Sequence, residues 1–426
     1  PHKKVLLVTN VEKGVVPCGI PYMAASLGKP EDNIMPTGML EKNGIEVLVA
    51  EVEQIKRQEK LLVADKECGI AYDKLVLATG ARPVLPKIEG IAKEGIFLIQ
   101  KELTALKEMF AYLKQSEEIV VIGGGFIGIE LADELSKLPG KKISLVELLP
   151  CLLANSFDAE FGALAEKKLK EKGVRILTGT KVAGFEGGSR VTGIKLADGT
   201  VLPAAAVVLA IGAVPNGALA AAVGLETGKG GGICVDEYMR TSDPDIFAIG
   251  DCAEKRDFYT RKSVSVMLAS TATAEARIAG SNLFGLKVVR ENKGTIAAYS
   301  TCIDGLVLAS AGLTEEAAKK EGFEIVIGTA EGVDKHPAAM PGSAPLKVKL
   351  IFSRHSGIIL GGQAAGGISC GEIINSIGLA IQTRMSFSEL ETLQIATHPW
   401  LTSAPTTYPL VAAAQNAAVK MNSGVI

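Results

Sequence analysis

The sequence predicts an α/β fold with more than one domain, and three observations support this prediction. Apolar runs at residues 4–9 and 74–79 have the length of buried strands. Residues 117–148 contain a strand, a glycine turn, a helix and a second strand in succession, which is a βαβ unit. From about residue 288 onward, strands precede two helical segments, a pattern typical of a separate α+β domain.

The composition is that of a globular protein. The 426 residues are 47% apolar and 22% charged, with a formal net charge of −2. Lysine and arginine are spread along the chain and form no basic stripe, so nucleic-acid binding is not expected. Seven cysteines without a CxxC pair indicate a reducing compartment and therefore a cytoplasmic protein.

One uncharged segment, residues 203–225, is long enough to be compared with a membrane span. Pro215-Asn216 interrupts it, and no lysine or arginine cluster flanks it. The stretch "AAAVVLAIG" is better explained as a buried parallel strand followed by a loop. We therefore predict no membrane segment.

The remaining elements follow from local pattern. Residues 44–73 alternate apolar and polar positions with polar interruptions, which predicts a small antiparallel meander. A change of composition in the glycine-rich residues 224–239 indicates a crossing between domains. Residues 268–285 predict a helix.

A glycine fingerprint lies in the βαβ unit. In "VVIGGGFIGIE", Gly123, Gly125 and Gly128 form G-x-G-x-x-G between an apolar strand and a helix. Such glycines allow a tight turn and let a pyrophosphate approach the helix N-terminal amides. A glycine turn that serves packing alone is the alternative, but Glu147 ends the next strand at about the spacing of the fingerprint. Its carboxylate would accept hydrogen bonds from the ribose hydroxyls and would repel a 2′-phosphate. We therefore expect the protein to bind NADH rather than NADPH.

Two further turns follow apolar strands, namely Thr79-Gly80 and Gly250-Asp251, and open α/β sheets bind ligands at such strand ends. With the βαβ unit between them and "PCGIPY" at residues 17–22, their order resembles the pyridine nucleotide-disulfide oxidoreductase family. The resemblance is to its single-cysteine branch of NADH oxidases, NADH peroxidases and coenzyme A-disulfide or sulfur reductases, and it covers nearly the whole chain.

The resemblance implies two Rossmann-like dinucleotide-binding domains and a C-terminal α+β dimerisation domain. An FAD-binding domain of residues 1–98 and 230–290 is interrupted by an NAD(H)-binding domain of residues 99–229. Residues 291–426 form the dimerisation domain, which implies a homodimer.

The resemblance also implies residue roles. Cys18 corresponds to the redox cysteine that faces the flavin, and Asp251 to the contact with the FAD ribityl chain. The helix that starts near Ala269 directs its positive end at the flavin ring. His398, in a His-Pro pair, corresponds to an acid and base presented to the partner subunit. The full cofactor-binding set is Thr79, Gly80, Gly123, Gly125, Gly128, Glu147, Gly212, Gly250, Asp251 and Ala269.

Cys18 lies between a proline and a glycine with no second cysteine nearby. Two-cysteine members of the family carry C-x-x-x-x-C, whereas Met23 occupies that position here. A lone thiolate at a helix start, its pKa lowered by the helix dipole, can form a sulfenic acid, a mixed disulfide or a persulfide. A small buried hydrophobe is the alternative. For the other cysteines, packing in cores or loops is expected: Cys68, Cys151, Cys234, Cys252, Cys302 and Cys370. We expect no metal site.

Two features depart from the family pattern. The opening strand and FAD glycine loop do not precede residues 4–9, and we expect the sequence to be part of a longer chain; FAD binding without this pyrophosphate-binding loop is the alternative. Ala339, Met340 and Leu401 stand where coenzyme A-disulfide reductases carry tyrosines, which makes that specific assignment weaker.

The implied activity is that of an FAD-dependent NADH oxidoreductase. Hydride passes from NADH to flavin, and the electrons continue through Cys18 to oxygen, peroxide or a small disulfide or polysulfide. Direct reaction of reduced flavin with oxygen is an alternative in the same class. A flavin-free NADH-binding or redox-sensing module is the alternative in a different class.

Overall fold

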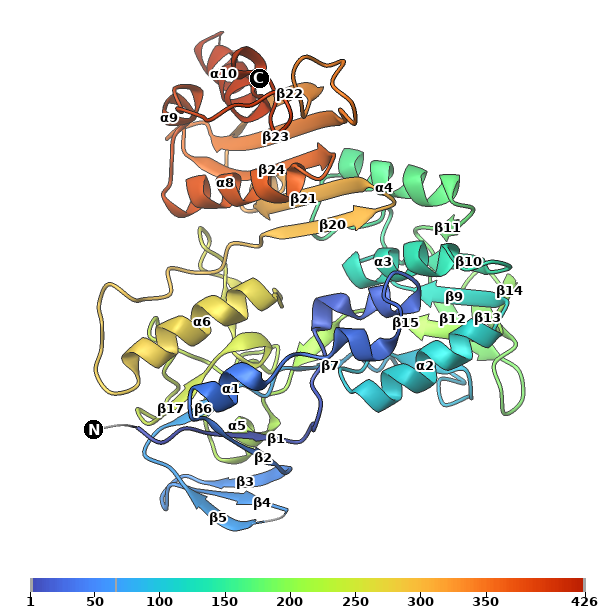
Figure 1. Ribbon diagram of the computed structural model, residues 1–426, viewed down its shortest axis with the longest axis vertical. Coiled ribbons are helices and arrows are strands. Elements are labelled where there is room, and N and C mark those ends of the chain that lie inside the picture. Colours follow the sequence, from blue (N-terminus) through green and yellow to red (C-terminus); the bar gives the residue numbers. More distant parts are fainter. Residues whose placement is uncertain (1–2, 66, 424–426) are drawn as a thin grey trace.

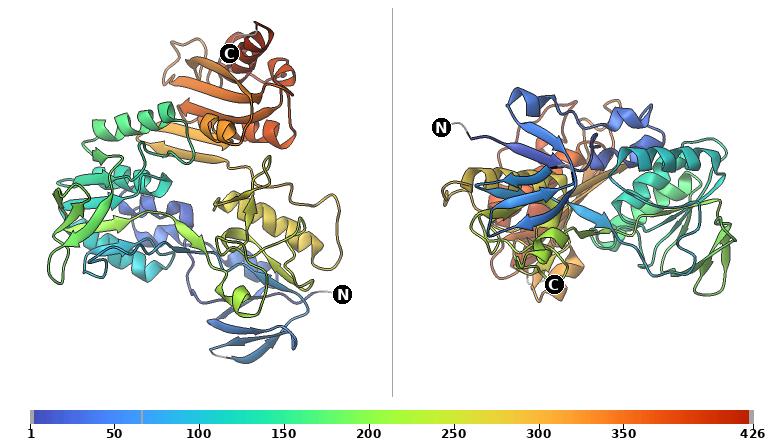
Figure 2. Two further views of the ribbon diagram at one scale, coloured as in Figure 1. Left: turned by 180° about the vertical axis from the view of Figure 1, so that it is seen from behind. Right: turned by 90° about the horizontal axis from the view of Figure 1, so that it is seen from below.

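The computed structural model describes residues 3–65 and 67–423. The chain forms three lobes, which are seen in opposite views in Figures 1 and 2. The predicted α/β fold with Rossmann-like sheets is confirmed by the parallel strand pairings described below.

The middle lobe contains a five-stranded sheet of order β11-β10-β9-β15-β8, in which every pairing is parallel. β8 ends before residue 99 yet joins this sheet, so the sheet extends across the predicted domain boundary. The elements are β8 (Ile96–Leu98), α2 (Leu103–Gln115), β9 (Glu118–Ile122), α3 (Phe126–Ser136), β10 (Lys142–Val146), α4 (Ala159–Glu171), β11 (Arg175–Leu177) and β15 (Ala206–Leu209).

The two faces of this sheet are covered differently. Ile119 and Val121 pack with apolar side chains of α2, α3 and α4. Val120 and Ile122, which point the opposite way along the same strand, pack against a three-stranded antiparallel sheet. Its strands are β12 (Val182–Glu186), β13 (Gly193–Leu196) and β14 (Val201–Pro203). Burial on both faces explains why β9 is apolar from Ile119 to Ile122.

The lobe that contains the N-terminal strands is assembled from two distant segments. The strands β1 (Leu6–Thr9) and β2 (Glu46–Val49) pair in parallel, and so do β6 (Leu75–Leu77) and β17 (Ile246–Ala248). The predicted meander is present from residue 52, whereas residues 46–49 pair with β1 instead. The meander strands are β3 (Val52–Lys56), β4 (Leu61–Ala64) and β5 (Glu67–Ala71), and the predicted helix is α6 (Ala269–Asn282).

Short elements connect these parts. β7 (Ala81–Pro83) pairs with β16 (Ala213–Pro215), and β18 (Lys255–Arg256) pairs with β19 (Ser263–Val264). The short helices of these two lobes include η3 (Pro30–Asn33), α1 (Gly38–Lys42) and α5 (Ala218–Ala222).

The C-terminal lobe is a five-stranded antiparallel sheet of order β20-β21-β24-β23-β22 with helices packed on it (Figure 1). The elements are β20 (Tyr299–Ile303), β21 (Leu306–Gly312), α7 (Glu315–Lys320), β22 (Ile325–Val333), β23 (Pro345–Ser353), β24 (Ile359–Gly366), α8 (Cys370–Gln382), α9 (Phe387–Glu391), η5 (Pro405–Thr407) and α10 (Pro409–Ser423). The prediction of strands followed by two helical segments omitted α7 and α9. Both are too short for a periodic pattern, and side-chain caps at Thr314 and Ser386 stabilise their starts.

The uncharged segment at residues 203–225 contains β15, whose residues are all buried in the central sheet. No helix within the described residues has the length and apolar character of a membrane span.

A buried ammonium group joins the middle and C-terminal lobes. Lys349 in β23 is 5% exposed, and its Nζ lies 2.8 Å from Asp158 Oδ2, 2.7 Å from Glu160 Oε1 and 2.8 Å from Glu315 Oε2. Burial acts to lower the pKa of Lys349, but the hydrogen bonds to these carboxylates raise it above its ordinary value. Gln363 also donates to Asp158, at 2.6 Å. The ammonium therefore offsets negative charge from both lobes.

We predict that Lys349→Met lowers the free energy of unfolding by about 3–5 kcal/mol, because it leaves the buried Asp158 carboxylate and the more exposed Glu160 and Glu315 without their counter-charge. Lys347→Met, in the same strand, removes a more exposed pair with Glu331 and is the control, with an expected loss of about 0–1 kcal/mol. Chemical denaturation of both variants measures the difference. Equal losses would contradict the role of Lys349 as a link between lobes.

Candidate active site

The glycine turn after β9 is closely packed at two of its three positions. Gly123 has a φ of +112°, and a Cβ atom there would lie 2.4 Å from the carbonyl oxygen of Ala210. A Cβ atom at Gly128 would lie 1.8 Å from the carbonyl oxygen of Gly123. Only glycine fits at these two positions, which lets α3 approach the ends of β9 and β15.

The third position is open. Gly125 is the exposed N-cap residue of α3, and a Cβ atom there would have no neighbour within 4 Å. No side chain caps this helix, and its first turn carries no acidic residue. Its N-terminal N–H groups are therefore available to an anionic ligand, which fits the pyrophosphate of a dinucleotide.

Glu147 is held beside this turn. Its carboxylate accepts the backbone N–H of Gly124, and it accepts that of Leu149 at 2.6 Å. Gly212 follows β15, the strand next to β9, so it lies at the same edge of the sheet as Gly123. The structure thus brings the predicted nucleotide-binding residues of the middle lobe to one edge.

A second pair of predicted turns meets in the N-terminal lobe. Because Leu77 of β6 pairs in parallel with Ala248 of β17, Thr79-Gly80 and Gly250-Asp251 leave the same sheet edge. Thr79 Oγ1 donates to the carbonyl oxygen of Asn216 at 2.6 Å, and the N–H of Asn216 donates to the carbonyl oxygen of Gly80 at 2.9 Å. The Thr79 hydroxyl therefore binds the segment at Asn216, where the chain comes back from the middle lobe.

Asp251 has a partner that the sequence did not indicate. Lys101 Nζ lies 3.0 Å from Asp251 Oδ2, and the Asp251 side chain is 18% exposed. α6 begins at Ala269 without a side-chain cap or an acidic first turn, and its Ala272 lies against Gly250. An acceptor carboxylate beside a free helix N-terminus fits the ribityl and ring portions of FAD.

Cys18 is exposed and lies in a tight turn rather than an α-helix. The segment forms two 3₁₀ helices, η1 (Pro17–Gly19) and η2 (Pro21–Ala24). The expected α-helix is absent because Pro21 has no N–H to donate to the carbonyl oxygen of Pro17, and its ring would clash with that oxygen. The sequence predicted that Cys18 lies at the start of an α-helix and next to the positive end of its dipole. No α-helix starts at this residue.

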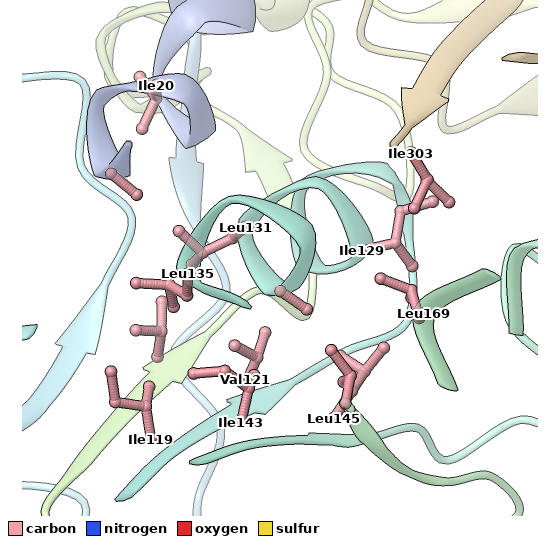
Figure 3. Close-up of a cluster of buried hydrophobic side chains, with 14 of the residues drawn as sticks. Ile20, Ile119, Val121, Ile129, Leu131, Leu135, Ile143, Leu145, Leu169 and Ile303 are labelled. Carbon is pink, nitrogen blue, oxygen red and sulfur yellow. The ribbon is translucent and has the colours of Figure 1, made fainter. Parts of the chain in front are cut away.

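The turn around Cys18 is nonetheless fixed. Ile20 and Met23 are buried in the core that contains α3, and Ile20 is seen beside Leu131 and Leu135 in Figure 3. Asn33 Nδ2 donates to the carbonyl oxygen of Val16 at 3.0 Å. The position of Cys18 is set by these neighbours, and Cys18 itself is exposed.

His398 lies in the C-terminal lobe, in the loop between α9 and η5. Its side chain is exposed, and its Nδ1 accepts the N–H of Trp400 at 3.3 Å. His336 is held instead by the carbonyl oxygen of Thr402, at 2.8 Å from its Nδ1. Cys18 and His398 thus belong to different lobes, and the structure does not bring them together within one chain.

The other cysteines differ in exposure. Cys252 and Cys370 are buried, Cys151 and Cys234 are half-buried, and Cys302 is exposed; the side chain of Cys68 lies outside the described part. Within the described residues, no group of three or more His, Cys, Asp or Glu side chains is arranged to hold a metal ion.

A buried carboxylate lies behind the cysteine segment. Glu130 of α3 accepts a 2.7 Å hydrogen bond from Thr301 Oγ1 of β20. Burial raises the pKa of Glu130 to about 7, and Asp133 and Glu134 add to this, while the Thr301 hydroxyl opposes it. The same carboxylates and burial raise the pKa of Tyr22 in η2. The sequence did not indicate that Glu130 is a buried, hydrogen-bonded carboxylate, because its partner Thr301 is distant in sequence.

Comparison with known proteins covers almost the whole chain. A family model described as pyridine nucleotide-disulphide oxidoreductase matches residues 2–276, and the model for the dimerisation domain of that family matches residues 300–409.

Individual relatives are similar over most of their length. The NADH oxidase of Methanocaldococcus jannaschii is 29% identical over 433 residues, which cover 98% of this chain and 94% of the relative. The CoA-dependent NAD(P)H sulfur oxidoreductase of Pyrococcus furiosus is 31% identical over 359 residues, or 82% and 79% of the two chains. The structure of a water-forming NADH oxidase from Lactobacillus brevis bound to NADH superposes with a TM-score of 0.91 at 26% identity, covering 99% and 94%.

The raised pKa of Glu130 predicts a pH-dependent stability. The unfolded carboxyl has a pKa of 4.5 and the folded one about 7, so the folded state binds the proton more tightly. Stability from this group is complete below pH 4.5 and is lost as the pH rises towards 7, by about 1.4 kcal/mol per pH unit. We expect Glu130→Gln, which keeps the acceptor for Thr301, to abolish this loss. Melting temperatures of both proteins from pH 5 to pH 8 measure it, and parallel pH profiles would contradict it.

Proposed function

Because the chain belongs to the pyridine nucleotide-disulphide oxidoreductase family, we propose that it is an FAD-dependent NADH oxidoreductase that uses Cys18 as its single redox cysteine. The supporting observation is the combination of an exposed thiol at Cys18 with a buried Met23 at the position of a second cysteine. An internal disulfide between these positions is therefore impossible, and the thiol is free for an external acceptor.

The nucleotide contacts are part of this proposal. The N–H groups at the start of α3 receive the pyrophosphate at Gly125, and Glu147 receives the adenosine ribose. The Glu147 carboxylate repels a 2′-phosphate, which favours NADH over NADPH. Relatives named for NADH and for NAD(P)H both occur, so family membership alone does not give the nucleotide preference. The proposed preference for NADH therefore rests on Glu147.

The flavin contacts complete it. Gly80 and Gly250 allow the main chain to approach the cofactor, Asp251 accepts a ribityl hydroxyl, and the start of α6 near Ala269 faces the ring. FAD in this site supplies the hydride acceptance and electron transfer that side chains cannot perform. In this proposal the NAD-binding domain is residues 96–229, which includes β8, and residues 1–95 and 230–290 make the FAD-binding domain.

Cys18 performs the sulfur chemistry. With a disulfide acceptor, its thiolate attacks one sulfur, forms a mixed disulfide and releases the other half as a thiolate. Two electrons from NADH and one proton then cleave the mixed disulfide, which releases the second half as a thiol and restores the Cys18 thiolate. With hydrogen peroxide, the Cys18 thiolate attacks one oxygen, the O–O bond breaks, and a sulfenic acid forms with release of hydroxide. Two electrons from NADH and one proton then restore the thiolate and release the sulfenic oxygen as water.

A homodimer through residues 291–426 belongs to the same proposal. The C-terminal lobe exposes several large apolar side chains, which supports an interface: Ile368, Leu379, Trp400, Leu401 and Val419. His398 lies in the same exposed loop as Trp400 and serves as acid and base for the partner subunit's thiol. A reducing cytoplasm suits a protein whose working group is a free thiol.

The visible absorption spectrum tests the function. We expect the full chain, saturated with FAD, to be yellow and to bleach when NADH is added under anaerobic conditions. The NADH concentration that gives half-maximal bleaching should be about ten-fold lower than that of NADPH, which corresponds to a difference in binding free energy of about 1.4 kcal/mol. A protein that stays colourless with added FAD, yet binds NADH, would instead be a flavin-free nucleotide-binding module.

Substitution of the cysteine tests its role. We expect Cys18→Ser to keep anaerobic bleaching by NADH and to lose turnover of disulfide, polysulfide or peroxide by about 100-fold or more, because the nucleophile is gone. Cys302→Ser, which removes another exposed thiol, is the matched control and should keep turnover. Acceptor turnover by Cys18→Ser at the wild-type rate would contradict the proposal.

A further inference from the structure

A buried ion pair lies directly behind the turn that carries Asp251. Lys255 and Glu275 have side chains that are 4% and 2% exposed, and Lys255 Nζ lies 3.1 Å from Glu275 Oε1. Lys255 belongs to β18 and Glu275 to α6, so the pair connects two elements that flank the turn. A buried pair is commonly no more stable than apolar side chains of the same size. The role of this pair therefore follows from the main-chain groups to which it is hydrogen-bonded.

Both side chains bind the main chain of that turn. Glu275 Oε2 accepts the N–H of Gly250 at 2.8 Å. Lys255 Nζ donates to the carbonyl oxygen of Gly250 at 2.6 Å and to that of Ala253 at 2.9 Å. Gly250 and Ala253 bracket η4 (Gly250–Cys252), so the pair fixes the backbone on both sides of Asp251.

The turn depends on this support. Gly250 has a φ of +70°, in the left-handed region that favours glycine. Without Glu275, its N–H would lose a buried partner, and a buried N–H without a partner is unfavourable. The turn also contacts α6 directly, because a Cβ atom at Gly250 would lie 3.5 Å from that of Ala272.

The charges in this region interact. Burial raises the pKa of Glu275, Lys255 and the Gly250 N–H lower it, and Asp251 raises it further. Asp251 is therefore close enough for its charge to act on Glu275. Lys101 Nζ pairs with Asp251 at 3.0 Å, so the Asp251 carboxylate has an exposed cation as its partner while its charge acts on the buried Glu275.

We infer that Lys255 and Glu275 are positioning residues for FAD, which hold the Gly250–Ala253 turn against α6 and so fix the Asp251 carboxylate relative to the N-terminus of that helix. The inference deepens the proposed function and rests on it. Neither side chain reaches the cofactor, because both are buried, and they act through Asp251 and the turn. The ligand portions concerned are the ribityl chain and the flavin ring.

Flavin binding to the full-length apoprotein tests the inference. Glu275→Gln keeps an acceptor for Gly250 but removes the charge, whereas Glu275→Leu removes both. Quenching of flavin fluorescence measures the dissociation constant of FAD, and the melting temperature of the apoprotein measures its stability. The control is Glu321→Gln, which removes a pair between Lys262 and Glu321 that lies outside the turn.

The expected order of effects is specific. The dissociation constant for FAD rises about 10-fold in Glu275→Gln and about 100-fold in Glu275→Leu, and changes less than about two-fold in Glu321→Gln. The absorption bands of FAD at saturation also shift in the Glu275 variants, because the carboxylate of Asp251 and the helix N-terminus move relative to the ring.

Other outcomes overturn the inference. If both Glu275 variants bind FAD as tightly as the wild type while the melting temperature of the apoprotein falls, the pair stabilises the fold and positions nothing. If Glu275→Leu does not fold, the FAD dissociation constant of Glu275→Gln decides between a positioning role and a purely stabilising role of the pair. If the wild-type chain takes up no FAD, the proposed function fails and the inference fails with it, which is a different result from unaltered binding by the variants.

Discussion

The parallel pairing of β17 with β6 is the interaction on which the flavin part of the site depends. The two strands are three residues long each and are separated in sequence by the whole middle lobe. Closing so long a loop is entropically unfavourable and needs compensation from contacts at its ends. Asp243 binds Arg57 at 3.0 Å beside the pairing, and Asp245 binds Lys60 and Lys74. Without this pairing, Thr79-Gly80 and Gly250-Asp251 would belong to unconnected parts of the molecule.

The features that were predictable from the sequence are those set by neighbours along the chain. Alternation and apolar runs identified β9, β10 and β15, and the glycine spacing identified the turn that joins β9 to α3. Close packing at Gly123 and Gly128 explains why spacing was sufficient, since no other residue fits there. The turn around Cys18 shows the limit of this approach. Its apolar residues resembled a short helix, but Pro17 and Pro21 divide it into two 3₁₀ helices.

Pairs between distant segments were not predictable. Lys101 with Asp251, Lys255 with Glu275 and Thr301 with Glu130 each join different elements. Nothing in the local sequence shows which of these residues pair, because the pairing follows from tertiary packing alone. The roles of Cys18 and His398 likewise came from the family resemblance, and the positions of their side chains relative to a ligand depend on the assembled molecule.

The apolar core around α3 is common to three regions of the chain. Ile20 of the cysteine segment, Leu131 of α3 and Ile303 of β20 belong to the same cluster, and Figure 3 shows the helix between the other two. Interiors are close-packed, so a change of shape at one of these side chains displaces the others. The C-terminal lobe is consequently not an interchangeable module. A chimera that takes this lobe from a relative would need the matching residues of α3 and of the cysteine turn, and sequence divergence at these three places is expected to be correlated.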